Sequence, residues 1–139
     1  MKESPSHGIG VFAVVDFKRR TKLCQYFGEK ISEEEADFRQ SKDSSDVIYM
    51  FRLNNGDIID AKNSFCIARR INHRCRDANC FVKENDNREL EVITKRKILA
   101  GEELNIDYMM NSEEGKPPIP CFCKSGYCTG SIDYCAKFN

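Results

Sequence analysis

Cysteines crowd one end of the sequence with a spacing typical of metal sites. Cys121, Cys123 and Cys128 supply three thiols within eight residues. A tetrahedral zinc site needs a fourth ligand, which either the nearby Cys135 or an upstream cysteine brought in by folding could provide. Spacing alone leaves that choice open, and buried or free thiols without metal are the competing interpretation.

Composition bounds the class of protein. The chain has 139 residues, the size of one domain, with 22 basic and 22 acidic residues. This balance gives no overall field that attracts nucleic acid or an anionic membrane, so neither partner is expected. The first residues lack the apolar core of a signal peptide. We therefore expect an intracellular protein whose clustered cysteines bind metal rather than form disulfides; composition leaves the oligomeric state open.

Local patterns predict the first elements of a mostly β domain. Residues 11–17 and 22–27 are rich in β-branched and aromatic side chains and predict a hairpin around the basic triplet Lys18-Arg19-Arg20. We interpret that triplet as a solvated turn rather than a nuclear address. Ser32, three residues before Glu35, has the form of a capping box for a short helix running towards Gln40.

Further strands are predicted in the second half of the chain. Asn54-Asn55-Gly56 is a strong hairpin signal between strands at 47–53 and 57–61. Residues 88–98 and 103–108 have strand patterns, and 109–120, with consecutive prolines, predicts a loop.

Four separated segments together resemble the SET domain of protein lysine methyltransferases. In the family's order they are Ser4 to Ala13, followed by Tyr26-Phe27-Gly28-Glu29; Ala68 to Cys80, which contains Asn72-His73; Gly101 to Tyr108; and Cys121 to Gly130. The resemblance implies small β-sheets around a knot-like crossing, where Asn72-His73 lies beside the Tyr108 segment. It also implies a SET domain over 1–110 and a zinc-binding post-SET segment over 111–139, packed on the same domain.

The resemblance implies an S-adenosylmethionine-dependent protein-lysine N-methyltransferase, in which the cofactor carries the chemistry and the protein orients it. The residues it assigns to the cofactor pocket are Gly8, Ile9, Gly10, Tyr49, Arg69, Asn72, His73 and Phe122. It assigns Tyr26 and Tyr108 to the walls of a lysine channel, with the Tyr108 hydroxyl fixing the line of attack. It makes Cys75 the fourth zinc ligand beside Cys121, Cys123 and Cys128, and leaves Cys135 as a spare thiol.

A basic protein tail, such as a histone tail bound as an added strand, is the expected substrate, which implies a nuclear or chromatin location. Ile106 stands two residues before Tyr108 and so faces the same side of a strand. In the SET domain family a tyrosine at this position resembles a brake, because its hydroxyl holds a water in the space that a methylated amine would need. Isoleucine has no hydroxyl, so the resemblance implies di- or trimethylation. The alternative is that Ile106 is an ordinary core residue of a β-strand.

Two other functions compete with methyl transfer. The positions where the sequence departs from the family's usual residues are Phe65, Cys66, Arg70 and Arg74. These departures are compatible with a SET-fold peptide-binding module of weak catalytic activity. The other candidate is a zinc-stapled interaction protein of a different fold.

Overall fold

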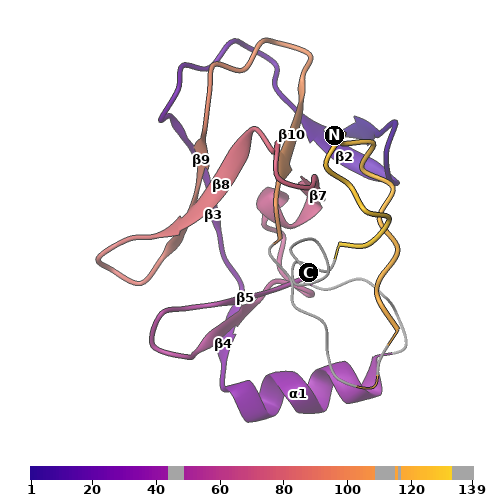
Figure 1. Cartoon of the computed structure of the whole chain (residues 1–139). Coiled ribbons are helices and arrows are strands. Elements are labelled where there is room, and N and C mark those ends of the chain that lie inside the picture. Colours follow the sequence, from indigo (N-terminus) through magenta and orange to yellow (C-terminus); the bar gives the residue numbers. More distant parts are fainter. Residues whose placement is uncertain (44–48, 109–114, 116, 133–139) are drawn as a thin grey trace. The chain divides into compact units, whose positions relative to one another are not determined.

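The computed structural model describes residues 1–43, 49–108, 115 and 117–132. The chain divides into two compact units (Figure 1). The first unit comprises Met1–Thr21, Arg70–Phe81 and Ile93–Asn139, and the second comprises Lys22–Arg69 and Val82–Val92. Two strands, β8 (Cys80–Glu84) and β9 (Leu90–Thr94), carry residues of both units.

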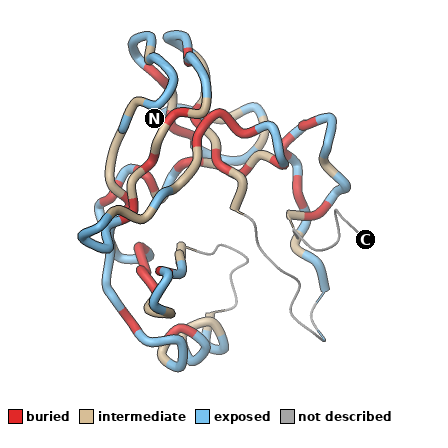
Figure 2. The backbone as a smooth tube through the Cα atoms, turned by 60° about the vertical axis from the view of Figure 1, so that its left-hand side comes forward, coloured by how far each residue is buried: buried red, intermediate tan, exposed pale blue. Residues whose placement is uncertain are grey.

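Strand β10 (Glu103–Ile106) is the centre of the first unit. It pairs antiparallel with β2 (Ile9–Phe12), which also pairs with the short β1 (Lys2–Glu3). It pairs in parallel with β7 (Asn72–His73) and with the first residue of β8. The buried residues, red in Figure 2, include Leu104 and Ile106 of β10. One short strand therefore joins segments that lie far apart in the sequence.

Two asparagines hold β10 against the start of β8. The backbone N–H of Asn79 donates to Oδ1 of Asn105 at 2.9 Å, and the backbone N–H of Asn105 donates to Oδ1 of Asn79 at 2.9 Å. The Asn79 side chain also donates to the carbonyl of Glu103 at 2.8 Å, and only 2% of Asn79 is exposed. This buried amide is satisfied on both sides, as burial of a polar group requires.

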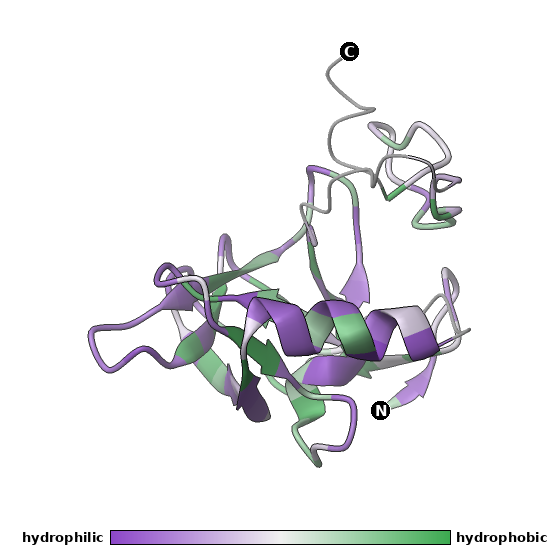
Figure 3. Cartoon of the chain, turned by 90° about the horizontal axis from the view of Figure 1, so that it is seen from below, coloured by the Kyte–Doolittle hydropathy of each residue, from purple (hydrophilic) through white to green (hydrophobic). Residues whose placement is uncertain are grey.

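In the second unit, β6 (Ile58–Asp60) lies between β4 (Glu29–Ile31) and β5 (Met50–Arg52) in an antiparallel sheet. Helix α1 (Glu33–Lys42) buries Ala36 against Ile31 and Ile58. Figure 3 shows the rest of this helix as mostly hydrophilic.

Further elements of the second unit are β3 (Lys22–Tyr26), which neighbours β9, and the 3-10 helix η1 (Ile67–Arg70), whose last residue belongs to the first unit. Arg39 fixes α1 to the sheet, because its guanidinium binds Glu29, Glu35 and Asp60 at 2.8 to 3.0 Å.

Several predicted elements are confirmed. Ser32 caps α1, and its hydroxyl accepts from the backbone N–H of Glu35 at 3.2 Å, although the helix continues two residues beyond Gln40. Strands β5 and β6 form the hairpin predicted at Asn54-Asn55-Gly56, where Gly56 has φ of +94°. The strands predicted at 88–98 and 103–108 are present in shorter form as β9 and β10. The mostly β architecture and the pairing of Asn72-His73 with β10 are also confirmed.

The hairpin predicted for 11–17 and 22–27 is wrong. Strand β2 ends at Phe12, and the following residues run beside the segment between β9 and β10. The backbone N–H of Ala13 donates to Glu102 at 2.9 Å, and Phe17 forms an antiparallel bridge with Ile98. Non-local pairing therefore overrides local β-propensity here. Among the described residues, no helix has the length and apolar character needed to cross a membrane.

Candidate functional site

The pairing of β7 with β10 brings together side chains that the sequence separates. The Asn72 amide donates to the carbonyl of His7 and to Oε1 of Glu103, both at 2.9 Å. The backbone N–H of Tyr108 donates to Nδ1 of His73 at 3.0 Å. The predicted residues Asn72, His73 and Tyr108 therefore share one hydrogen-bonded region with the carboxylate of Glu103.

The glycine turn, which we define as Gly8 to Gly10, packs closely against this region. Gly8 has φ of +49°, a conformation that glycine adopts without strain. A Cβ at Gly10 would overlap Oε1 of Glu103 and lie 3.3 Å from Nδ2 of Asn72. Ser4 holds the other oxygen of this carboxylate, donating to Oε2 at 2.9 Å. Gly10 is therefore required by the close approach of Glu103, whereas Ile9 beside it is 54% exposed.

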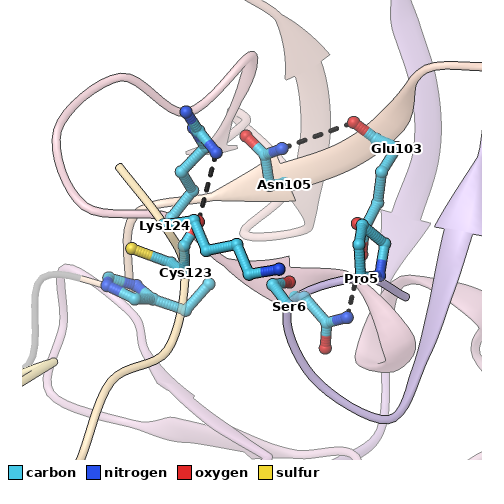
Figure 4. Close-up of a pocket in the computed structure, with 9 residues that line it drawn as sticks. Pro5, Ser6, Glu103, Asn105, Cys123 and Lys124 are labelled. Carbon is cyan, nitrogen blue, oxygen red and sulfur yellow. Dashed lines mark hydrogen bonds between the residues drawn. The ribbon is translucent and has the colours of Figure 1, made fainter. Parts of the chain in front are cut away.

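A pocket of about 80 Å³ opens beside the glycine turn (Figure 4). Its lining residues all belong to the first unit and are Pro5, Ser6, Asn72, His73, Arg74, Glu103, Asn105, Cys123 and Lys124. The pocket combines one carboxylate with two cations. Figure 4 shows the Lys124 side chain extending towards Ser6. This lining suits a ligand group that carries both signs of charge.

Arg74 is held in place by Asp77 and Cys123. Its guanidinium binds the Asp77 carboxylate at 2.8 and 3.0 Å and donates to the carbonyl of Cys123 at 3.2 Å. Burial works to raise the pKa of Asp77, but hydrogen bonds from Arg74 and Ser125 outweigh it and hold that pKa below its usual value. Arg74 therefore ties the pocket to the cysteine segment.

Four cysteines converge next to the pocket. The sulfurs of Cys75, Cys121, Cys123 and Cys128 all lie within 4.8 Å of one another. The Cys75 and Cys121 sulfurs are 3.8 Å apart. A tetrahedron with Zn–S bonds of about 2.3 Å has sulfur–sulfur edges of about 3.8 Å. The donor set and its spacing therefore fit one zinc ion.

The thiols of this cluster differ in acidity. Burial raises the pKa of Cys121 well above its usual value. Burial also works to raise the pKa of Cys123, but backbone hydrogen bonds from Cys75 and Ser125 together with the neighbouring thiols lower it to about 7. Cys123 therefore ionises more easily than Cys121 near neutral pH.

Three of the predicted site residues lie in the second unit. Tyr26 is 3% exposed, and its hydroxyl donates to the carbonyl of Tyr49 at 2.5 Å. The Arg69 guanidinium lies 5.0 Å from the centre of the Tyr49 ring and donates to the carbonyls of Ala61 and Lys62. Tyr49 and Arg69 are therefore in contact, as a shared role would require.

The remaining predicted residues lie in the first unit. The Tyr108 hydroxyl donates to the carbonyl of Ile71 at 2.7 Å. Ile106 is 2% exposed and Phe122 is 64% exposed. Cys135 lies outside the described residues.

The sequence reasoning missed six residues of the pocket, which are Pro5, Ser6, Arg74, Glu103, Asn105 and Lys124. Glu103 and Asn105 belong to a segment that carried the resemblance, so their motif could have identified them. Lys124 stands between two metal-binding candidates and had no separate signal.

Comparisons with known proteins agree with this geometry. The family model of the SET domain matches residues 8–109. The chain is 35% identical over 133 residues to Histone-lysine N-methyltransferase trr of Drosophila melanogaster, covering 92% of this chain and 5% of that protein. It is 35% identical over 136 residues to Histone-lysine N-methyltransferase 2D of Homo sapiens, covering 92% of this chain and 2% of that protein.

A fungal protein, Histone-lysine N-methyltransferase, H3 lysine-4 specific, from Yarrowia lipolytica, is 31% identical over 136 residues, covering 94% of this chain and 12% of that protein. The chain thus spans only a small part of the curated relatives it matches. The family match includes five of the nine residues that line the pocket, namely Asn72, His73, Arg74, Glu103 and Asn105. The chain therefore belongs to the SET domain family.

Proposed function

We propose that this chain transfers methyl groups from S-adenosylmethionine to a lysine side chain of a histone tail. The observation that carries the proposal is a pocket lined by residues of β7, β10 and the N-terminal segment in a chain of the SET domain family. Each relative compared above is named a histone-lysine N-methyltransferase. These names favour an enzyme over the peptide-binding module.

The residues present fit the cofactor. When bound, S-adenosylmethionine supplies an electrophilic methyl group on a sulfonium and carries an amino-acid end with both signs of charge. The carboxylate of Glu103 and the ammonium of Lys124 match those charges, whereas Arg74 is paired with Asp77. Gly10 lets Glu103 approach the backbone, because a Cβ there would overlap its carboxylate, and we assign Gly8, Ile9, Asn72 and His73 to this side of the proposed pocket. Tyr49, Arg69 and Phe122 remain assigned to it by resemblance.

The target lysine must lose its proton before it can attack, because its unperturbed pKa is about 10.4. We assign Tyr26 and Tyr108 to an apolar channel that disfavours the ammonium form by desolvation. Within this proposal, the Tyr108 hydroxyl orients the amine. The hydrogen bond from the Tyr108 backbone to His73 supports this role, because it fixes the backbone from which the ring projects.

We assign one structural zinc ion to Cys75, Cys121, Cys123 and Cys128, which would secure a post-SET segment over 111–139 to a SET domain over 1–110. The names of the fungal relatives make lysine 4 of histone H3 the first substrate to test. A nuclear, chromatin-associated location follows from a histone substrate.

The test is transfer of a labelled methyl group to histone H3. The purified chain is incubated with labelled S-adenosylmethionine and an H3 tail peptide, or with the same peptide in which lysine 4 is replaced by arginine. We expect label on the first peptide alone. Label on both peptides would redirect the search to another lysine. Calorimetric binding of the H3 peptide without any transfer would instead support the peptide-binding module.

A further inference from the structure

Two basic triplets that are far apart in the sequence lie side by side in the first unit. Figure 1 shows the segment between β2 and β3 running beside the segment between β9 and β10. Phe17 bridges Ile98, and the backbone N–H of Arg20 donates to Thr94 at 3.0 Å. The residues of this basic patch are Lys18, Arg19 and Arg20 from one segment and Lys95, Arg96 and Lys97 from the other.

Hydrogen bonds hold the two triplets together. The Arg19 side chain donates from Nε to the carbonyl of Lys95 at 3.1 Å. The hydroxyls of Thr21 and Thr94 both donate to the carbonyl of Lys18, at 2.7 and 2.8 Å. These bonds fix the backbone positions from which the basic side chains of the patch project.

The charge of the patch is not neutralised within the described part of the chain. All its residues are exposed except Lys95, which is half-buried. Among the described residues, only Arg96 of the patch forms an ion pair, with Glu102 at 2.9 Å. The other carboxylate of these two segments, Asp16, accepts from the backbone N–H of Ala100. A chain with no net charge thus carries six cations on two adjacent segments.

We propose that this basic patch binds the phosphate backbone of double-stranded DNA. Closely spaced lysines and arginines that lack carboxylate partners gain most from a surface of regularly spaced phosphates, from which they release counterions. Duplex DNA is favoured over other polyanions because histones carry DNA wrapped around them, so this choice rests on the proposed function. The equal numbers of basic and acidic residues gave no reason to expect DNA binding, because a net charge averages over the whole chain and does not show local clusters.

The test is binding of a fluorescent duplex of random sequence to the full chain at several salt concentrations. We expect an association constant whose logarithm falls linearly with the logarithm of the salt concentration. The double variant Lys18→Gln/Lys97→Gln should make this negative slope less steep by about 2 and weaken binding at low salt by about tenfold or more. The matched control Lys30→Gln/Lys42→Gln removes the same charge from the second unit and should bind as the unchanged chain does.

Two results would overturn the assignment to DNA. One is equal binding by the patch variant and the control. The other is preferential binding of phosphatidylserine vesicles or polyglutamate over the duplex, which would assign the patch to a membrane or an acidic protein.

Methyl transfer to a free H3 peptide is measured in parallel, because Lys18 and Lys97 lie outside the proposed pocket. A chain that binds DNA but transfers no methyl group refutes the proposed function alone. A chain that methylates the peptide but binds no duplex refutes the DNA proposal alone.

Discussion

The Nε2 atom of His73 lies 3.1 Å from the sulfur of Cys75, so one side chain touches both the pocket and the cysteine cluster. Because the backbone N–H of Tyr108 donates to Nδ1 of the same ring, Nδ1 is an acceptor and Nε2 carries the proton. The imidazole therefore donates towards a candidate zinc ligand. We therefore propose that His73 is a positioning residue rather than a general base.

We expect about one zinc ion per chain, held by the four clustered cysteines. Cys75→Ser should reduce the metal content to about zero, because serine does not replace a buried thiolate ligand. Cys135→Ser and Cys24→Ser are the matched controls and should retain the metal. Elemental analysis of the purified proteins measures the content, and loss of zinc in Cys135→Ser with retention in Cys75→Ser would identify a local fourth ligand instead.

Zinc affinity should rise with pH. Thiolates bind the metal and protons compete for the same sulfurs. The pKa of Cys123 is lowered to about 7, so this thiol ionises through the neutral range, whereas the raised pKa of Cys121 keeps that thiol protonated in the absence of metal. Affinity should therefore still increase above about pH 7, with release of protons on binding. Competition with a chelator between about pH 6 and about pH 8 measures this, and a constant affinity over that range would contradict it.

Gly28→Ala should destabilise the chain by about 1–3 kcal/mol through overpacking. A Cβ at this position would overlap the carbonyl oxygen of Asp60 and lie 2.8 Å from Cα of Ala61, both of which are backbone atoms that cannot rotate away. Gly126→Ala is the control, since no atom lies within 4 Å of its added Cβ. Urea unfolding measures the free energy of unfolding of both variants. Equal values would show that the backbone of β6 moves away from the added Cβ without loss of stability.

Tyr108→Phe should slow methyl transfer by about 10- to 1000-fold if its hydroxyl acts by orientation and electrostatics. It should also cost about 0.5–1.5 kcal/mol of stability, because the hydroxyl donates to the carbonyl of Ile71. Tyr127→Phe removes a hydroxyl from a ring that is 58% exposed and should leave the rate unchanged. An unchanged rate in Tyr108→Phe would remove this residue from the mechanism.

The unchanged chain should produce di- or trimethyl-lysine, and Ile106→Tyr should restrict it towards monomethyl-lysine. Ile106 is 2% exposed, so both Ile106→Tyr and Ile106→Phe overpack the core by a similar volume. Only tyrosine adds a hydroxyl that can hold a blocking water, which makes the phenylalanine variant the control. Mass spectrometry of a peptide after exhaustive turnover reports the outcome, and an unchanged chain that stops at one methyl group would exclude this role.

Elements with a local signal were predicted best from the sequence. Ser32 and Glu35 define the start of α1 by their spacing, and Asn55-Gly56 defines the hairpin of β5 and β6. Strand β8 was missed, and the pairing of residues 13–21 was assigned wrongly. Both depend on partners distant in sequence, which periodicity does not reveal.

The site shows the same division between local and non-local information. Cys121, Cys123 and Cys128 were found by spacing, whereas Cys75 came from family resemblance, and the structure brings all four sulfurs together. Arg74 departs from the family's usual residue, yet it binds both Asp77 and the carbonyl of Cys123. No local pattern contains that connection, because it forms only after the cysteine segment folds back.

The central position of β10 has a consequence for the order of folding. Its partners β2, β7 and β8 all precede it in the chain, so the ribosome delivers each of them before the strand that joins them. The first unit consequently has a high contact order. The entropy cost of closing its long loops comes before strand pairing stabilises its sheet. The strands that await β10 keep open edges in the nascent chain, where unpaired backbone groups favour aggregation.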